Sequence, residues 1–263
     1  MALITESQLR TMLKEGIPSP YPINKGDRLT PAATDFLKER GIKLDLLSTM
    51  SMASSHLPGD ASGKLTVPVG VSNRHIHLSP EDMERLFGTG YVLTPFRDLS
   101  QPGQFAAKEK VTLLGPDGLI KDVRILGPTR KATQVEISKT DGFHLGIHPP
   151  IRLSGLIEAT PGVTLIGPKG CAVLNEGVIV AKSHVHMGPD DAKHFKVTNG
   201  DSLMVKTAGD RSVIFANVSV RVSPAYILDL HIDRDEANAA NLITGDKVSV
   251  IGKNGKLLSW NGR

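Results

Sequence analysis

The feature that most constrains this chain is an internal repeat that carries a pair of histidines in each copy. The segments RHIHLSPEDMERLF and SHVHMGPDDAKHF, which begin at residues 74 and 183, align without gaps at a spacing of 109 positions. In each copy a His-Xaa-His sequence precedes a proline and two acidic residues. Such a match between distant parts of one chain indicates a duplicated structural unit.

A second, gapped similarity extends the repeat. The segment VRILGPTRKATQVEIS in the first copy runs parallel to VRVSPAYILDLHID in the second, and the alignment sets Glu136 opposite His231. Residues i and i+2 of a strand point to the same face, about 6.5–7 Å apart, so each histidine pair can share one metal ion. The repeat therefore predicts two ligand triads, namely His75, His77 and Glu136, and His184, His186 and His231.

Three protein ligands leave a coordination position open, which is typical of catalytic rather than structural zinc sites. Imidazole and carboxylate ligands suit Zn²⁺ and do not exclude Fe²⁺, Mn²⁺ or Co²⁺. A single His-Xaa-His is more often a surface pair or a hydrogen-bonded core pair than a metal site. Its recurrence at equivalent positions of the repeat favours the metal interpretation.

From about residue 65 onward, short Val/Ile/Leu-rich runs alternate with Gly/Pro/Asp turns, in a chain of 263 residues with 26 Gly and 17 Pro. Many short strands at this spacing predict β-barrels or sandwiches. We expect a mainly β protein with two duplicated β-barrel domains and short capping helices. The expected boundaries are 65–160 for the first barrel, 161–250 for the second and 251–263 for a C-terminal tail.

The first 46 residues have a different apolar pattern from the rest of the chain, and this pattern predicts a helical N-terminal extension. Two amphipathic segments, TESQLRTMLKE and TPAATDFLKERGIKL, flank a proline-rich connector, and a Ser/Gly-rich linker spans 47–64. Helices this short are marginal alone in water. The apolar stripe of the first helix must therefore be buried against the barrels or against a partner protein; it comprises Leu9, Met12 and Leu13.

Composition excludes several classes of function. The formal net charge is +4, but the chain has no Lys/Arg block and no interleaved aromatic residues, which argues against nucleic-acid binding. No apolar run reaches the roughly 18 residues of a membrane span, and no secretory signal begins the sequence. The single cysteine, Cys171, fits a reducing cytosol. We expect a cytoplasmic protein.

Two further positions bear on anion binding. Arg130 ends the turn GPTR just before the strand that carries Glu136, and an arginine there suits bidentate recognition of phosphate. Taken singly, any such arginine is more often a solvated surface charge. Ser154 lies in IRLSG, which by its spacing is an ordinary polar loop. Arg74 precedes the first histidine pair and would face away from it on a regular strand.

The motifs VGVSNRHIHLS, LSQPGQFAAKEKVTLLGPDG, VRILGPTRKATQVEIS, IRLSG and AKSHVHM resemble those of the PduL-type phosphotransacylases, or phosphate propanoyltransferases. The similarity covers nearly all of residues 65–250. It implies two β-barrels with two zinc ions per chain, one on each triad. It also implies that Arg130 holds phosphate, and that Ser154 matches a family serine near the site.

The resemblance implies reversible exchange of phosphate and coenzyme A on a short acyl group, propanoyl or acetyl. It implies a bacterial microcompartment location of the propanediol utilisation type, with residues 1–46 contacting shell or cargo proteins. A homo-oligomer is left open. Two alternatives remain, a dinuclear metallohydrolase and a non-enzymatic microcompartment scaffold with structural metal; the open coordination position argues against the scaffold.

Overall fold

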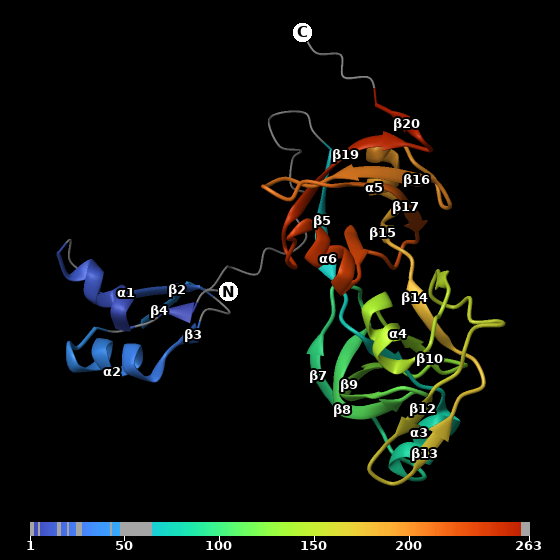
Figure 1. The fold of residues 1–263 in the computed structure, drawn as a ribbon. Helices are drawn as coiled ribbons and strands as arrows, with labels where there is room; N and C mark the ends of the chain where they lie inside the picture. Colours follow the sequence, from blue (N-terminus) through green and yellow to red (C-terminus); the bar gives the residue numbers. More distant parts are fainter. Residues whose placement is uncertain are drawn as a thin grey trace. The chain divides into compact units, whose positions relative to one another are not determined.

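The chain divides into two compact units, Met1–Pro58 and Gly59–Arg263, drawn in Figure 1. The computed structural model describes residues 3–4, 6–14, 17–19, 21–24, 28–42, 44–47 and 65–258. Residues 48–64 of the predicted linker and residues 259–263 of the predicted tail lie outside the described residues. No helix within the described ranges is long and apolar enough to cross a membrane.

The first unit consists of two β-α-β segments. The first segment contains β1 (Leu3–Ile4), α1 (Glu6–Thr11), a 3₁₀ turn (Met12–Lys14) and β2 (Tyr21–Asn24). The second contains β3 (Arg28–Leu29), α2 (Pro31–Glu39) and β4 (Leu44–Leu47). Strand β1 pairs with β3 and strand β2 with β4, both in parallel. The two halves also repeat in sequence, as MLKEGI and FLKERGI.

Both predicted helices are present, but the extension is not purely helical. The predicted proline-rich connector contains strand β2, and three further strands flank the helices. Strands of two to four residues are too short to leave an alternating apolar pattern, so the sequence did not reveal them. For Leu9, the expectation that the apolar stripe is buried against the barrels or a partner was also wrong. Leu9 is fully buried within the unit itself, in a core with Ala33, Phe36 and Leu37.

One sheet of the second unit has nine strands and is curled, and no strand pairing in the described ranges closes it into a barrel. Its order is β11-β14-β10-β6-β9-β8-β12-β13, with β7 paired to β8. Its strands are β6 (His75–His77), β7 (Pro95–Asp98), β8 (Phe105–Leu114), β9 (Leu119–Gly127), β10 (Gln134–Glu136), β11 (Ile151–Arg152), β12 (Thr164–Ile166), β13 (Cys171–Val173) and β14 (Val178–Ala181).

The other sheet of this unit closes into a six-stranded barrel. Its order is β16-β17-β15-β18-β5-β19, the pairing of β16 with β19 completes the ring, and β20 adds to the edge of β19. Its strands are β5 (Thr66–Val71), β15 (His184–Met187), β16 (Ser202–Lys206), β17 (Ile214–Val222), β18 (Asp229–Ile232), β19 (Lys247–Lys253) and β20 (Lys256–Leu257).

The mainly β prediction is therefore confirmed, with one closed barrel and one curled sheet in place of the two predicted barrels. The sheets also exchange chain segments. Strand β5, from the start of the unit, pairs with β18 and β19 in the barrel, whereas β12, β13 and β14 belong to the curled sheet. Sheet membership therefore does not divide the chain at residue 160. Strand β19 runs past residue 250, where the tail was expected to begin.

Four short helices occupy equivalent places in the two sheets. Helices α3 (Pro80–Phe87) and α5 (Pro189–Phe195) follow the two His-Xaa-His strands, and each begins with the proline of the repeat. Helices α4 (Lys139–Leu145) and α6 (Arg234–Ala240) follow β10 and β18. The side chains of Ser138 and Asp233 cap α4 and α6, each within a capping box.

Each sheet encloses its own apolar core, and polar contacts join the sheets. Ile76 and Leu165 are fully buried in the core of the curled sheet, and Val185 and Leu230 in that of the barrel. The side chain of Gln101 forms two hydrogen bonds with the backbone of Ile227, at 3.0 and 3.2 Å. The backbone N–H of Thr140 donates to Asp235 Oδ2 at 2.9 Å, so the first turns of α4 and α6 meet.

Candidate active site

The six predicted ligands are brought together as two triads in equivalent positions of the two sheets. In the curled sheet β6 runs antiparallel to β10, and His75 lies opposite Glu136. In the barrel β15 runs antiparallel to β18, and His184 lies opposite His231. Within each triad the candidate ligand atoms lie within 4.8 Å of one another. The third ligand, inferred from the gapped alignment, therefore falls beside the histidine pair in both copies.

Two backbone carbonyl groups orient the first histidine of each pair. His75 Nδ1 lies 2.8 Å from the carbonyl oxygen of Asn73, and His184 Nδ1 lies 2.8 Å from that of Lys182. In each case the imidazole donates its Nδ1–H to the carbonyl, since the carbonyl oxygen can only accept. Nε2 of both neutral rings then carries a lone pair. A hydrogen bond of this kind commonly fixes the tautomer of a metal-binding histidine.

The first triad places two electron-rich atoms face to face. His75 Nε2 lies 3.4 Å from Glu136 Oε2, and both side chains are almost fully buried. A lone pair and a carboxylate oxygen at this distance require a cation between them, either a proton or a metal ion. The pKa values reflect this arrangement. Burial alone would lower the pKa of His75, but the charge and hydrogen bond of Glu136 outweigh it and raise that pKa.

The same partnership acts on the carboxylate. Burial would raise the pKa of Glu136, but the charge of His75, its hydrogen bond and the charge of His77 hold that pKa well below the usual range. Burial, together with the charges of His75 and Arg130, lowers the pKa of His77 to about 3. Glu136 is therefore ionised and His77 neutral at neutral pH. A carboxylate and a neutral imidazole are in the protonation states that a metal ion requires.

The second triad contains buried nitrogen atoms without partners. Nδ1 and Nε2 of His186 and Nε2 of His231 accept or donate no hydrogen bond among the described residues. His231 Nε2 is 3.1 Å from Asp229 Oδ2, although not in hydrogen-bonding geometry. Burial and the charges of neighbouring histidines lower the pKa of His184 to about 4 and that of His186 to about 3. Buried polar atoms normally have a partner, so this cluster of imidazoles is suited to hold a metal ion.

Arg130 and Ser154 join the first triad through a hydrogen-bonded network. Arg130 Nη1 donates to Ser154 Oγ at 2.9 Å, and Gln134 Nε2 donates to the same oxygen at 2.8 Å. Gln134 Nε2 also reaches Glu136 Oε1 at 2.6 Å, and its carbonyl oxygen accepts from the backbone of Gly155 at 2.7 Å. Burial lowers the pKa of Arg130 from its ordinary value, but a guanidinium stays protonated in proteins. A cation therefore lies at the edge of the triad.

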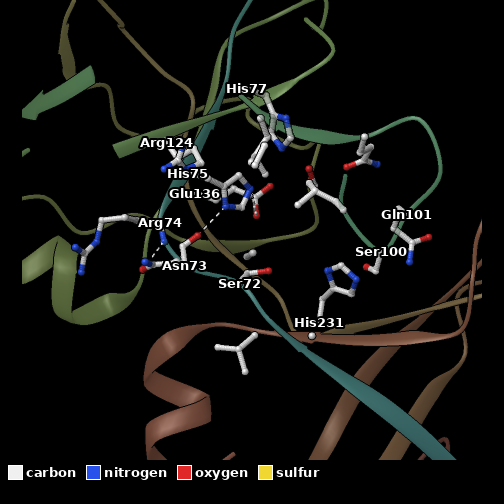
Figure 2. A pocket seen from close by; sticks show the side chains of 18 of the residues that line it. Ser72, Asn73, Arg74, His75, His77, Ser100, Gln101, Arg124, Glu136 and His231 are labelled. Carbon is white, nitrogen blue, oxygen red and sulfur yellow. Dashed lines mark hydrogen bonds and ion pairs between the residues drawn. The ribbon is translucent and has the colours of Figure 1, made fainter. Parts of the chain in front are cut away.

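One cavity of about 810 Å³ is lined by all six triad residues together with Arg130 and Ser154. Figure 2 shows His231 projecting from the barrel strand toward the side of the cavity where His75 and Glu136 lie. Both triads line this one cavity, so their candidate ligand atoms face a common space. Further cations line the same cavity, namely Arg74, Arg97, Lys110, Lys121, Arg124 and Arg221.

Several residues of the site, in the cavity wall or in the hydrogen-bonded network beside it, were not predicted from the sequence. Gln134 lies two positions before Glu136 on the same strand face, so its spacing could have revealed it. Asp229 occupies the equivalent place before His231. The ring of Tyr226 lies 4.2 Å from that of His186, between centroids. Gln101 and Tyr226 lie on loops, and loop packing leaves no periodic signal. Arg74, as expected, is directed away from the triad; it pairs with Asp141 of α4.

Comparison with known proteins identifies the family. A family model described as phosphate propanoyltransferase matches residues 68–243. A phosphate propanoyltransferase of Thermotoga maritima is 56% identical over 184 residues, which cover 70% of this chain and 88% of that protein. One of Priestia megaterium is 54% identical over 181 residues, covering 69% and 83%, and one of Salmonella typhimurium is 53% identical over 175 residues, covering 66% and 83%.

This chain belongs to the phosphate propanoyltransferase family. It is an acyltransferase, so the predicted enzyme class is confirmed. The residues matched by the family model include both triads, Arg130 and Ser154, and begin after the end of the first unit. Phosphate propanoyltransferase activity therefore rests on the curled sheet and the barrel, where the cavity lies.

Proposed function

We propose that this phosphate propanoyltransferase acts reversibly on propanoyl-CoA or acetyl-CoA with two zinc ions, one held by His75, His77 and Glu136 and the other by His184, His186 and His231. The observation that carries the proposal is the pair of buried triads on one cavity, with imidazole nitrogens that have no hydrogen-bond partner in the described ranges. Two imidazoles with a carboxylate, or three imidazoles, suit zinc and leave a coordination position open.

The ions would supply two kinds of chemistry, Lewis-acid polarisation of a thioester carbonyl and a soft site for a thiolate sulfur. The protein's own residues prepare the site for them. Burial keeps His77, His184 and His186 neutral, and the Nδ1–H bonds of His75 and His184 direct their Nε2 atoms away from the backbone. The hydrogen bond that Gln134 Nε2 donates to Oε1 of Glu136 fixes the orientation of this carboxylate.

Arg130 is proposed to bind the attacking phosphate. Phosphate is already anionic at neutral pH, so it needs orientation and charge compensation more than a strong base. Ser154, whose hydroxyl oxygen also accepts from Gln134, holds the guanidinium of Arg130 at the cavity wall that includes Glu136. In the forward reaction a phosphate oxygen forms a bond to the acyl carbon and the carbon–sulfur bond of the thioester breaks. The products are an acyl phosphate and the CoA thiolate.

Coenzyme A has three phosphate groups and needs a basic binding surface. Arg97, Lys110, Lys121 and Arg124 line the cavity from strands β7, β8 and β9. Cationic side chains gathered on one wall favour a polyanionic ligand. We propose that this wall binds the phosphates of CoA, while its sulfur reaches the triads.

The repeat supports an origin of both sheets from one duplicated barrel unit, since β6 and β15, β10 and β18, and their following helices are equivalent. We further propose a cytoplasmic protein inside a bacterial microcompartment, with the first unit contacting shell or cargo proteins. A homo-oligomer is compatible with this arrangement. The exposed side chain of Leu13 in the first unit offers an apolar contact point.

Acceptor specificity tests the proposed chemistry. Purified protein with propanoyl-CoA should release CoA when phosphate or arsenate is present and not with water alone. Hydrolysis without an oxyanion would favour the metallohydrolase alternative. The family match already favours acyl transfer over that alternative and over the non-enzymatic scaffold.

A further inference from the structure

The residue that precedes each His-Xaa-His pair contacts the helix that follows the third member of its triad. Arg74 precedes His75, and its guanidinium pairs with Asp141 of α4, with Nε 3.0 Å from Oδ2 and Nη2 2.7 Å from Oδ1. Ser183 precedes His184, and its hydroxyl donates to Glu236 Oε1 of α6 at 2.8 Å. Asp141 and Glu236 are both the third residue of their helix, so the contacts are equivalent in the two sheets.

Each acidic side chain also closes the capping box of its helix. Asp141 Oδ2 accepts from the backbone N–H of Ser138 at 3.2 Å, and Glu236 Oε2 accepts from that of Asp233 at 3.0 Å. Ser138 and Asp233 each lie two residues beyond the third ligand of their triad. In each sheet, therefore, a single carboxylate contacts two sites. It binds the residue two positions beyond the third ligand and the residue just before the first histidine.

We propose that Arg74 and Ser183 are positioning residues. Arg74 acts through Asp141, and Ser183 acts through Glu236. Each contact holds the two ligand strands of one triad at the spacing that metal binding requires. This inference rests on the proposed function in that the triads bind zinc. It assigns no further ligand. It gives a role to two side chains that are not metal ligands, and to the helices that follow the third ligand of each triad.

The short ligand strands explain why such a contact is needed. Strands β6 and β10 each have three residues, so few backbone hydrogen bonds fix their relative position. Metal sites tolerate deviations of only about 0.2 Å in ligand distance, and outer hydrogen-bond partners commonly affect metal affinity by about 10- to 100-fold. The bidentate pair with Asp141, which is 5% exposed, fixes both distance and orientation. The single hydroxyl contact of Ser183 fixes distance alone.

The test uses full-length protein in two backgrounds that each retain one triad. His184→Ala/His186→Ala leaves the first triad, and His75→Ala/His77→Ala leaves the second. Zinc affinity is measured by competition with a chromophoric chelator. In the first background Arg74→Gln should weaken zinc binding by about tenfold or more, whereas Ser183→Ala should not change it. In the second background the effects should be reversed, with only Ser183→Ala weakening zinc binding.

Two further variants separate positioning from general loss of structure. Arg74→Lys keeps the charge but not the planar fork, so its zinc affinity should fall between those of the parent and Arg74→Gln. Arg85→Gln removes another arginine–aspartate pair, to Asp82 at the start of α3, which does not reach the third ligand. It should leave zinc affinity unchanged in both backgrounds.

The outcomes distinguish this inference from the function on which it rests. If neither background binds zinc, the proposed zinc sites are wrong. If both bind zinc, but Arg74→Gln and Ser183→Ala have no effect or weaken both triads equally, the positioning role is wrong. Equal weakening by the Arg85→Gln control would also overturn it, because the effect would then follow from lost surface charge.

Discussion

Arg130 donates from Nη1 to the hydroxyl oxygen of Ser154 at 2.9 Å, across 24 positions of sequence. The same hydroxyl accepts from Gln134, which also holds Glu136. The cation proposed to bind phosphate is thus connected to a proposed metal ligand through only two polar side chains. A change at Arg130 is therefore expected to alter phosphate binding without removing the ligands of the triad.

Arg130→Lys should raise the phosphate KM or lower turnover, while the fold and the metal content stay as in the parent. A lysine retains the charge but cannot reproduce the planar fork that matches phosphate and Ser154. Steady-state kinetics at varied phosphate concentration measure the effect, with Lys131→Gln, on the neighbouring exposed residue, as the control. Unchanged phosphate kinetics in Arg130→Lys would place the phosphate site elsewhere.

Metal content is the second prediction. Protein purified without chelator should carry close to two zinc equivalents per chain, and His184→Ala/His186→Ala should remove about half of them, because each triad forms a separate cluster. Removal of the metal should lower the melting temperature, since a ligand bound only by the folded state stabilises it. Elemental analysis is the measurement. Active protein without bound metal would contradict the proposal.

The triads could be predicted from two signals, the residue spacing within each strand and the internal repeat. His75 and His77 share a strand face through i, i+2 spacing, and the gapped repeat located Glu136 and His231 opposite them. The exchange of β5 into the barrel could not be predicted in this way. Its partner β18 lies about 160 positions later. The apolar sequence of a strand indicates that the strand is buried, but it does not indicate which strand is its partner.

Loop contacts were equally inaccessible to sequence reasoning. Gln101 binds the backbone of Ile227 across 126 positions, and nothing in its turn sequence specifies that partner. The contact of Arg74 could be predicted only in part. Strand alternation predicted that it would not face the triad, but its partner Asp141 depends on where α4 begins. In both cases the missing information is a tertiary contact and not a local conformational preference.

The contact of Gln101 with Ile227 leads to a third prediction. Gln101→Met fills a similar volume but removes two hydrogen bonds between the curled sheet and the loop that carries Tyr226, whose ring lies against His186. We expect the free energy of unfolding to fall by about 1–2 kcal/mol and turnover to fall as well. Urea unfolding and steady-state kinetics measure the two effects. If stability and turnover both match those of the parent, this contact has no role in holding the loop.

A fourth prediction concerns pH. Burial raises the pKa of Glu236 above the ordinary value of a glutamate. The folded protein then binds this proton more tightly than the unfolded chain, so the free energy of unfolding falls as pH rises through the interval between the two pKa values. Glu236→Gln removes this dependence. As pH rises from about 4.3, the ordinary pKa of a glutamate, the metal-free parent should lose stability relative to metal-free Glu236→Gln, as measured by urea unfolding. A constant difference between the two proteins would contradict the raised pKa.

The last prediction concerns the first unit. Leu9 of its apolar stripe is buried in the unit's own core with Ala33, Phe36 and Leu37, so the burial of Leu9 does not require the second unit. The family match begins at residue 68, after the end of the first unit. Protein lacking residues 1–58 should therefore keep its acyltransferase activity and melting temperature. It should no longer associate with shell or co-encapsulated proteins. A pull-down from a host that forms microcompartments measures this association.

Two matched variants distinguish the effect of the surface of the first unit from the effect of its folding. Leu13→Ser changes a side chain that is 47% exposed, whereas Phe36→Ser disrupts the buried core. If an apolar surface mediates association, Leu13→Ser should weaken it while the circular dichroism spectrum stays that of the parent. Phe36→Ser should abolish it through loss of the folded unit. Aggregation or inactivation of the protein lacking residues 1–58 would show instead that this unit is needed for the stability of the second, because truncation would then have removed part of a shared fold.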